Sequence, residues 1–419
     1  MLERKRKLDC ANGREKADLV LKNGNVLNVF TEEVLKADVA ICGDTIVGVG
    51  EYEGKEEIDC TGKYLVPGFI DAHMHIESCM AAPGELAKVL AKAGTTTIIA
   101  DPHEIVNVSG TKGMDYFLKC AAKLLVNVFF MVPSAVPATD VETNGCGEFL
   151  ASDMMKYVDN ARVLGLGETM RFMECCEGEK RMADKLELFA KKHIDGHAPG
   201  IRGKEVQAYR LAGVENDHEC STAEEVLDKL RAGLHIYVRE GSGAKNLETL
   251  IKTMLDAGVC LDRCAFCTDD KHVEEIRKEG HISTCIRKAI ALGVPVAKAY
   301  KMGSYQAAEF YGLKNYGAIG AGYRADIVFL DDLEQVRPLD VMKDGRILTE
   351  EDYAKDYSVP VPDELLHTVH VGEVTKEKIR LSCDGKTDVI QMNPHQIVTT
   401  HLVEEVPTEN GYFKSDGVY

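Results

Sequence analysis

Apolar and polar residues alternate along residues 18–60, a period typical of strands with one buried face. Glycines interrupt the alternation at intervals that suit turns between strands. We therefore predict a small antiparallel sheet in the first sixty residues. The pattern is carried by residues 17–21, 37–41 and 45–49, with Gly24, Gly43 and Gly54 at the expected turns.

From about residue 64 the pattern changes to short apolar runs that alternate with amphipathic stretches of helical period. Eight such β–α units over roughly 250 residues have the size of a closed barrel. The expected strands are 68–73, 97–101, 126–132, 163–168, 195–198, 213–217, 236–240 and 263–269. The clearest helical patterns are 85–93, 185–192, 223–232, 247–257 and 286–292.

An open, doubly wound sheet is the alternative to a barrel. Such a sheet usually carries a Gly-rich phosphate turn after its first strand. Gly165-x-Gly167 and Gly241-x-Gly243 both lack the third glycine of that turn, so the motif is absent. The barrel is the better prediction.

After about residue 313 the strand pattern returns, at 317–319, 324–330 and 341–346. These segments look like the second half of the small sheet. We predict an α/β fold in which a (β/α)₈ TIM-like barrel is inserted in a small β-sandwich domain formed by both chain ends. The expected divisions are 1–66 for the first part of the β domain, 67–312 for the barrel, and 313–419 for its return and the start of a C-terminal region.

Composition narrows the range of partners. The chain has 419 residues and a net charge of −18, which disfavours nucleic acid and anionic membranes as partners. The basic residues 1–7 are not followed by an apolar run, so we expect no signal peptide, and no stretch is apolar enough to span a bilayer. Fourteen cysteines without a secretion signal predict reduced thiols and a cytoplasmic location. Cys264 and Cys267 lack a second pair for zinc and are interpreted as strand residues.

The first barrel strand ends in the most informative motif, PGFIDAHMH at 67–75. Side chains alternate along a strand, so His73 and His75 point to the same side. Two imidazoles at the carboxyl end of one strand form half of a metal site.

Other strand ends carry further candidate groups, and barrel active sites lie at those ends. Imidazoles and carboxylates that converge there suit a divalent first-row metal. The candidates are His103 and Glu104 after the second strand, Glu168 after the fourth, His197 after the fifth, His218 in the sixth, Arg239, Glu240 and Ser242 after the seventh, and Asp269 after the eighth.

Each candidate also has a purely structural interpretation. A lone histidine at a strand end is more often a hydrogen-bonded core residue, and Glu168 or Asp269 could cap the next helix. Six candidate ligands at the same end of five strands favour the metal site. His193, His235, His272 and His281 fit structural roles better because they lie in expected helices, at a strand start or in the following loop.

The motif at 67–75, together with 317–319 and 322–328, resembles the amidohydrolase superfamily. Within it, the chain is most similar to the adenine deaminase family. Dihydroorotase- and hydantoinase-like relatives bridge their metals with a carboxylated lysine, whereas this chain has Glu168 at that position. The motifs that carry the closer resemblance are 71–78, 101–105, 165–168, 195–199, 216–219, 239–242 and 267–270.

This resemblance implies hydrolytic deamination of adenine to hypoxanthine and ammonia by a metal-bridging hydroxide, with a role in purine salvage. It implies two divalent ions, Mn²⁺ or Fe²⁺ foremost and Zn²⁺ as an alternative, and a small-molecule substrate. A homo-oligomer is compatible with the family, although no residue pattern shows one. The implied metal ligands are His73, His75, Glu168, His197, His218 and Asp269.

We expect Asp269 to move the proton of the hydroxide, and Glu104 or Glu240 to protonate the purine ring. Arg239 or Ser242 could bind the purine edge, and His103 could contact substrate or serve as an accessory ligand.

One departure concerns length, because family members continue past the sequence at 394–398 into a further domain. We expect this chain to be truncated at its C-terminus. Two alternatives stay open. The chain could be another metal-dependent amidohydrolase that acts on a cyclic amide or an aminated heterocycle, or an inactive truncated remnant.

Overall fold

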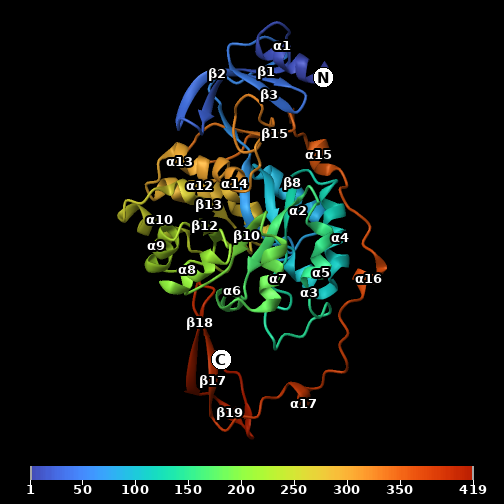
Figure 1. Ribbon diagram of the computed structural model, residues 1–419, viewed down its shortest axis with the longest axis vertical. Helices are drawn as coiled ribbons and strands as arrows, with labels where there is room; N and C mark the ends of the chain where they lie inside the picture. Colours follow the sequence, from blue (N-terminus) through green and yellow to red (C-terminus); the bar gives the residue numbers. More distant parts are fainter. Residues whose placement is uncertain (1, 418–419) are drawn as a thin grey trace.

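The structure is a computed structural model that describes residues 2–417 (Figure 1). A mixed sheet occupies one end of the molecule, a large β–α region forms the middle, and a C-terminal hairpin projects from the opposite end (Figure 1). Among the described residues, none of the helices has both the length and the apolar character needed to traverse a lipid bilayer.

Both chain ends build the mixed sheet, as predicted. Its strands run in the order β16-β15-β14-β5-β1-β2-β3, with β4 paired to β1. β1 is antiparallel to β2 but parallel to β4 and β5, so the prediction of a purely antiparallel sheet was wrong. Alternation along one strand does not reveal which neighbour it pairs with, because both pairings share the same period. The bounds are β1 Ala17–Asn28, β2 Glu33–Cys42, β3 Thr45–Gly50, β4 Gly54–Asp59, β5 Tyr64–Pro67, β14 Ile327–Leu330, β15 Asp340–Lys343 and β16 Arg346–Ile347.

The middle region consists of parallel strands in two sheets, β10-β9-β8-β7-β6 and β11-β12-β13. Backbone bonds join the sheets at both junctions: Glu215 N donates to Ile194 O (3.0 Å), and Asp269 N donates to His73 O (3.0 Å). The predicted α/β class is confirmed. The bounds are β6 Phe69–Met74, β7 Thr95–Ala100, β8 Asn127–Val132, β9 Val163–Thr169, β10 His193–Gly196, β11 Asn216–Asp217, β12 His235–Arg239 and β13 Cys264–Cys267.

Helices lie around the outside of these strands (Figure 1). The helix predicted at 185–192 lies earlier in the chain, at Lys180–Leu188, and the one predicted at 286–292 begins at Ile282. Helix ends are set by caps and neighbours more than by period. The bounds are α1 Leu2–Ala11, α2 Pro83–Lys92, α3 His103–Ser109, α4 Thr111–Ala121, α5 Ala151–Met154, η1 Met155–Tyr157, α6 Phe172–Glu177, α7 Lys180–Leu188, α8 Lys204–Leu211, α9 Ala223–Arg231, α10 Leu247–Asp256, η2 Leu261–Arg263, α11 Val273–Glu279, α12 Ile282–Ala291, α13 Val296–Met302 and α14 Tyr305–Phe310.

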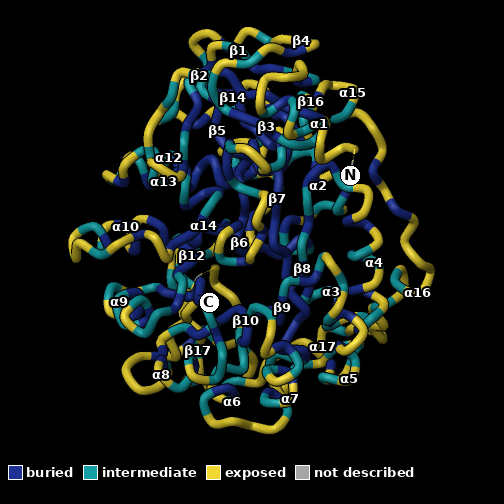
Figure 2. The backbone as a smooth tube through the Cα atoms, turned by 45° about the horizontal axis from the view of Figure 1, so that its top comes forward, coloured by how far each residue is buried: buried dark blue, intermediate teal, exposed yellow. Residues whose placement is uncertain are grey.

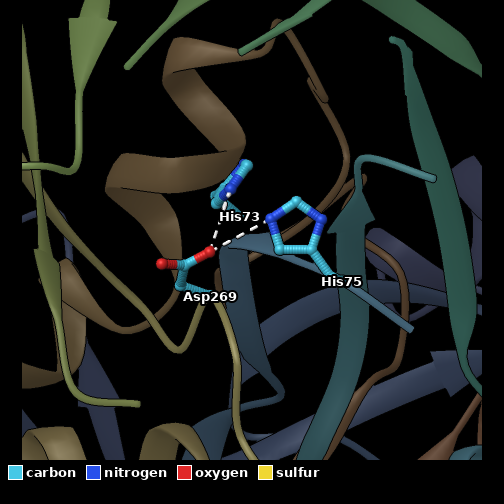
Figure 3. A group of neighbouring side chains, drawn as sticks. All are labelled: His73, His75 and Asp269. Carbon is cyan, nitrogen blue, oxygen red and sulfur yellow. Dashed lines mark ion pairs between the residues drawn. The ribbon is translucent and has the colours of Figure 1, made fainter. Parts of the chain in front are cut away.

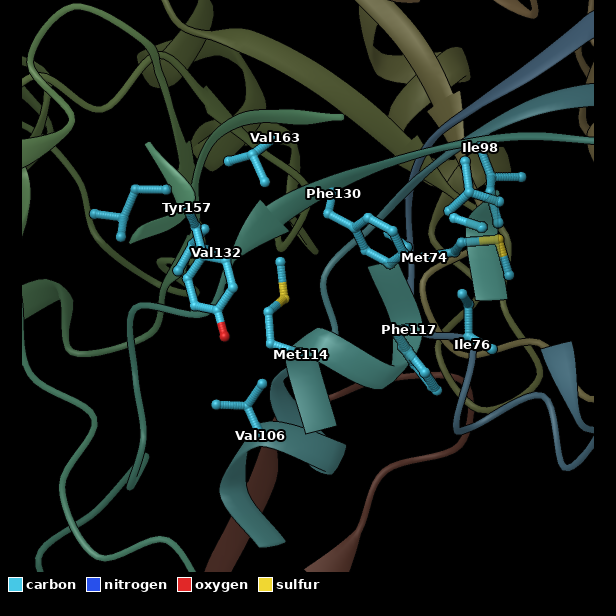
Figure 4. Packing of buried hydrophobic residues seen from close by; sticks show 14 of the residues in the cluster. Met74, Ile76, Ile98, Val106, Met114, Phe117, Phe130, Val132, Tyr157 and Val163 are labelled. Atoms are coloured by element: carbon cyan, nitrogen blue, oxygen red, sulfur yellow. The ribbon is translucent and has the colours of Figure 1, made fainter. Parts of the chain in front are cut away.

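The strands of the middle region are buried along almost their whole length (Figure 2). Apolar side chains from β6, β7 and β8 pack against α4, where Phe130 meets Met114 and Phe117 (Figure 4). A parallel sheet covered by helices has no solvent-facing side, which explains the continuous apolar runs in the sequence. The close-packed core holds the carboxyl ends of the strands in fixed positions.

The C-terminal segment is mostly exposed. Three short helices lead to a hairpin whose strands pair over their full length, from Lys386 opposite Glu405 to Met392 opposite Thr399. The hairpin lies beyond the lower end of the β–α region in Figure 1. The bounds are α15 Glu350–Ala354, α16 Asp363–Leu366, α17 Lys376–Ile379, β17 Lys386–Met392, β18 Thr399–Glu405, β19 Thr408–Glu409 and β20 Tyr412–Phe413.

All fourteen cysteines lie among the described residues and are free thiols, as predicted. Cys264 and Cys267 are buried in β13 and are confirmed as strand residues. Burial raises the pKa of Cys264 to about 12, which keeps this thiol protonated.

Candidate metal centre

The two histidines at the end of β6 face the carboxylate of Asp269, which follows the neighbouring strand β13 (Figure 3). Asp269 Oδ1 lies 3.1 Å from His75 Nε2 and 3.6 Å from His73 Nε2. The backbone of Asp269 bonds to β6 through its N–H and also through its C=O, which accepts from His75 N (3.1 Å). Asp269 has a φ of 56°, in the left-handed region that few non-glycine residues adopt and that aspartate tolerates better than most.

The ring of His75 is held in one orientation. Its Nδ1 lies 2.8 Å from the carbonyl oxygen of Asp101, and because a carbonyl only accepts, Nδ1 carries the proton of that bond. The lone pair of the neutral ring is therefore on Nε2, the atom that faces Asp269. A backbone carbonyl that fixes the tautomer in this way is typical of metal-binding histidines.

Glu168, at the end of β9, lies at the centre of the cluster. Its Oε1 is 2.9 Å from His103 Nδ1 and 3.4 Å from His75 Nε2. Its Oε2 is 2.5 Å from His197 Nδ1 and 3.2 Å from His218 Nε2. Each oxygen of one carboxylate thus faces a different pair of imidazoles, an arrangement in which Glu168 could bridge two ions.

His218 connects the two halves of the site. Its ring stacks on that of His73 with centroids 4.0 Å apart, and its Nε2 also lies 3.3 Å from Glu219 Oε1. Ligand atoms of these residues form overlapping groups within 4.8 Å of one another. The groups are His73, His75 and Asp269; His73, Glu168 and His218; His75, His103 and Glu104; His197, His218 and Glu219; and Asp101, His103 and Glu168.

Buried polar atoms without partners test whether a metal fits here. Among the described residues, both ring nitrogens of His73 and of His218 are buried and make no hydrogen bond. Buried polar atoms in native proteins are nearly always satisfied, so these nitrogens call for a partner that the polypeptide does not provide. A divalent ion bound by imidazole and carboxylate would satisfy them, and the donor set suits first-row metals.

Burial and neighbouring histidines shift the pKa values of the site carboxyl groups in opposite directions. Burial raises the pKa of a carboxyl group, but His197, His103 and His218 hold the pKa of Glu168 well below its ordinary value. The pKa of Asp269 is likewise well below its ordinary value, because His73, His75 and the charges of His218 and Arg239 outweigh burial. Both carboxylates are therefore ionised at neutral pH. Burial and the neighbouring His218 lower the pKa of His73 to about 4, which leaves that ring neutral and ready to bind a cation.

Arg239 is fully buried and donates hydrogen bonds to two carboxylates of the site. Its Nη1 donates to Asp269 Oδ2 (2.7 Å) and to Glu219 Oε1. Its Nε and Nη2 donate to Asn246 Oδ1 at 3.2 and 3.0 Å. Because Oδ2 of Asp269 is held by Arg239, Oδ1 is the oxygen that faces the histidines.

Glu104 lies beside the cluster and is its most exposed carboxylate, with 36% of its side chain accessible. Its Oε2 is 3.5 Å from His75 Nδ1 and its Oε1 is 3.7 Å from His103 Nε2. Glu104 and His103 are thus close to both the ligand cluster and solvent.

Two of the candidates are not brought into the cluster. Glu240 follows Arg239, and its Oε1 accepts from Lys288 Nζ (2.5 Å) on α12. Neighbouring residues of a strand point to opposite sides, which explains why Arg239 faces Asp269 and Glu219 whereas Glu240 faces a helix. Ser242 Oγ donates to Glu275 Oε2 (2.9 Å) and accepts from His272 N (3.0 Å), in the loop after β12.

The structure adds residues that the sequence prediction did not include in the site. Glu219 faces His197, His218 and Arg239, and adjacency to His218 was the available signal. Asp101 supports both His75 and Glu168, whose N–H donates to Asp101 Oδ2 (2.8 Å).

A second supporting group contacts the segments that carry His73 and Asp269. His281 Nε2 is 3.1 Å from Asp71 Oδ2, and Asp71 Oδ1 accepts from His73 N at 3.1 Å. Thr268 Oγ1 also donates to Asp71 Oδ2 (2.5 Å). The network connects both residue 73 and residue 268, next to Asp269, to one buried histidine. Its partners are distant in sequence, so no local pattern could reveal it.

The chain is similar in sequence to known amidohydrolases. The model of the amidohydrolase family matches residues 64–348. An adenine deaminase of Desulfitobacterium hafniense (strain Y51) is 46% identical over 408 residues, which cover 97% of this chain and 71% of the relative. An adenine deaminase of Clostridium acetobutylicum is 43% identical over 415 residues, covering 98% of this chain and 72% of that protein.

Solved structures agree in fold. A crystal structure of an adenine deaminase superposes with a TM-score of 0.60 at 20% identity, covering 80% of this chain and all (100%) of the other. The β-aspartyl dipeptidase of Fervidobacterium islandicum AW-1 gives a TM-score of 0.58 at 18% identity over 81% of this chain and 98% of its own. At these identities the likeness concerns the fold alone. Together with the family match over most of the β–α region, these findings show that the chain belongs to the amidohydrolase family.

Proposed function

We propose that this protein hydrolyses adenine to hypoxanthine and ammonia. The observation that carries the proposal is the position of Glu168, whose two oxygens each face two histidines. A glutamate there, rather than a lysine, accompanies 46% identity to an adenine deaminase over nearly the whole chain.

The residues fit two divalent ions, for which we propose His73, His75, Glu168, His197, His218 and Asp269 as ligands. Mn²⁺ or Fe²⁺ suits this mixture of imidazole and carboxylate, and Zn²⁺ is the alternative. When bound, such ions supply a hydroxide nucleophile at neutral pH, because they lower the pKa of water from about 15.7 to about 7.

Asp269 is the residue we propose for proton transfer. Arg239 fixes its Oδ2, so Oδ1 is directed at His73 and His75, where the nucleophile would be generated. Its pKa lies well below the ordinary value, so the carboxylate is available to accept a proton from the nucleophile. It would then deliver that proton towards the purine ring or the departing amine.

Glu104 is the better candidate for a second proton donor than Glu240, because Glu104 lies beside His75 and His103 whereas Glu240 pairs with Lys288. His103 would contact the substrate or act as an accessory ligand. The internal bonds of Arg239 favour a role in holding carboxylates over binding the purine edge, and Ser242 stays a candidate for that edge.

The finer features of the fold belong to the same proposal. We infer that the two parallel sheets act as one closed (β/α)₈ barrel over 67–312, with 1–66 and the first part of 313–419 forming the β domain. A role in purine salvage would follow from the proposed reaction, and the fourteen free thiols support the proposal of a cytoplasmic location.

Ammonia and hypoxanthine release from adenine by the full chain, purified with Mn²⁺, tests the proposed function. Guanine, cytosine and a cyclic amide such as dihydroorotate serve as competing substrates. Glu104→Gln should lower kcat more than Glu240→Gln does. Turnover of another substrate in place of adenine, with two ions bound, would reject adenine as the substrate, and no turnover of any of them would indicate an inactive remnant.

A further inference from the structure

The turn of the C-terminal hairpin touches the loop that follows β12. Lys245 N donates to the carbonyl oxygen of His395 (3.1 Å), so the backbone of the turn is fixed to this loop. The next residue, Asn246, is fully buried and donates from Nδ2 to Gln396 Oε1 (3.2 Å). The hairpin thus contacts the β–α region through one backbone bond and one side-chain bond close to the metal centre.

The orientation of both amides in this contact is determined by Arg239. A guanidinium only donates, so Asn246 must turn its oxygen towards Arg239 and its amide nitrogen towards the hairpin. Gln396 must then present its own oxygen to Asn246. Residue 396 must therefore supply a hydrogen-bond acceptor to Asn246 Nδ2. An apolar side chain at 396 would leave this buried amide donor unsatisfied.

The same bonds continue to the ligand cluster. Asn246 Oδ1 holds Nε and Nη2 of Arg239, which aims Nη1 at Asp269 Oδ2 (2.7 Å) and at Glu219. Asp269 Oδ1 in turn faces His75 and His73. A continuous set of hydrogen bonds runs from the hairpin turn to the metal centre.

We infer that Gln396 is a positioning residue for the metal centre, acting through Asn246 and Arg239 on the carboxylate of Asp269. The inference rests on the proposed metal site and deepens it. The C-terminal segment, 150 residues away from Asn246 in sequence, thereby takes part in setting the geometry of the ligands.

The first test uses variants that differ only in the acceptor. Gln396→Met removes the oxygen at similar length, and Gln396→Glu retains an acceptor for Asn246. Gln391→Met is the matched control, because Gln391 lies on the same hairpin, is exposed and makes no side-chain hydrogen bond among the described residues. The readouts are Mn²⁺ affinity of the metal-free protein, measured by chelator competition, and kcat and KM for adenine.

Gln396→Met should weaken Mn²⁺ binding and lower kcat by about 2- to 30-fold, with KM little changed, and Gln396→Glu should recover most of the loss. The Mn²⁺ measurement needs no adenine, so it remains informative if the protein acts on another substrate. Unchanged Mn²⁺ affinity and kcat in Gln396→Met, or equal losses in Gln391→Met, would overturn the inference.

A double-mutant cycle covers the case in which Gln396→Met simply detaches the hairpin. Asn246→Leu alone should cause the larger loss, about 10- to 100-fold, because Asn246 contacts Arg239 directly. If Gln396 acts through Asn246, adding Gln396→Met to Asn246→Leu changes nothing further. Additive losses in the double variant would show that Gln396 acts by another route and would contradict the inference.

Discussion

The two ends of the strand array both carry histidines, yet they differ in what surrounds them. At the carboxyl ends, His218 is buried between Glu168 and Glu219, and these carboxylates raise its pKa well above the ordinary value despite burial. At the amino end of β12, His235 lies against the ring of Phe310, with centroids 4.5 Å apart. Burial and the nearby Arg263 lower the pKa of His235 to about 4.

Burial acts in the same direction on both histidines, so the difference lies in the facing groups. His218 lies among carboxylates that could bind a cation together with its ring, whereas His235 packs against the ring of Phe310. The position along the strand determines which surroundings a histidine meets, since loops at the carboxyl ends supply the acidic residues.

The largest effect should follow from changing the carboxylate that faces four of the histidines. Glu168→Gln removes a ligand charge while keeping the size, so kcat should fall by more than the roughly 100-fold expected of a supporting residue. Steady-state deamination and metal content by elemental analysis measure this change. Glu187→Gln, on the exposed side of α7, is the matched control. Full activity in Glu168→Gln would show that the carboxyl ends do not form the centre.

Metal removal tests the same end of the array without mutation. If Mn²⁺ binds only the folded protein, it should stabilise the fold by about 2.7 kcal/mol at a concentration 100 times its Kd. Thermal unfolding of chelated and Mn²⁺-loaded protein measures the difference. Glu168→Gln should lose this stabilisation, and His235→Phe should keep it. If both variants lost the stabilisation by Mn²⁺ equally, the proposed difference between the carboxyl and amino ends of the strands would be wrong.

An intermediate effect is expected from the buried network of Asp71, Thr268 and His281. His281→Phe removes one of the partners of Asp71 and of Thr268, and the side-chain partner of the Thr95 hydroxyl, and an unsatisfied buried group costs about 1–3 kcal/mol. Stability should fall by that order, and kcat by about tenfold or more, because Asp71 holds the backbone of His73. Urea unfolding and steady-state kinetics check both. Loss of stability without loss of kcat would confine His281 to a structural role.

The smallest effect on activity is expected from a substitution of His235, at the amino end of β12. Since the pKa of His235 is about 4 in the folded protein and 6.5 ordinarily, the unfolded chain binds protons more readily as pH falls between these values. His235 therefore reduces stability as pH falls through that window. His235→Phe should show a shallower decline in unfolding free energy between pH 6.5 and pH 4 than the parent, with activity at pH 7 unchanged within about twofold. Parallel declines in parent and variant would show that His235 does not titrate in this way.

Sequence patterns predicted this molecule best where the information is local. The apolar runs of β6 to β9, with His73 and His75 at the end of β6, follow from period and spacing, and so does the participation of both chain ends in the mixed sheet. The pairing of β1 with β4 and β5, and the network of Asp71, Thr268 and His281, depend on contacts between distant segments. Strand alternation explains why Glu240 faces α12 while Arg239 faces the ligands, but the pattern could not say which of the two pointed inward.

The backbone bonds of Asp269 to His73 and His75 have a consequence for folding. They join the last strand of the array to the first, across nearly 200 residues of chain, and the side chains at this junction are the ligands we propose for the metal. Closing so long a loop is entropically costly and slow compared with local contacts. On the ribosome, the metal centre can form only after residue 269 has emerged. An ion held by His73, His75 and Asp269 would stabilise the pairing of the first and last strands. Amide hydrogen exchange at this junction should therefore slow when metal binds.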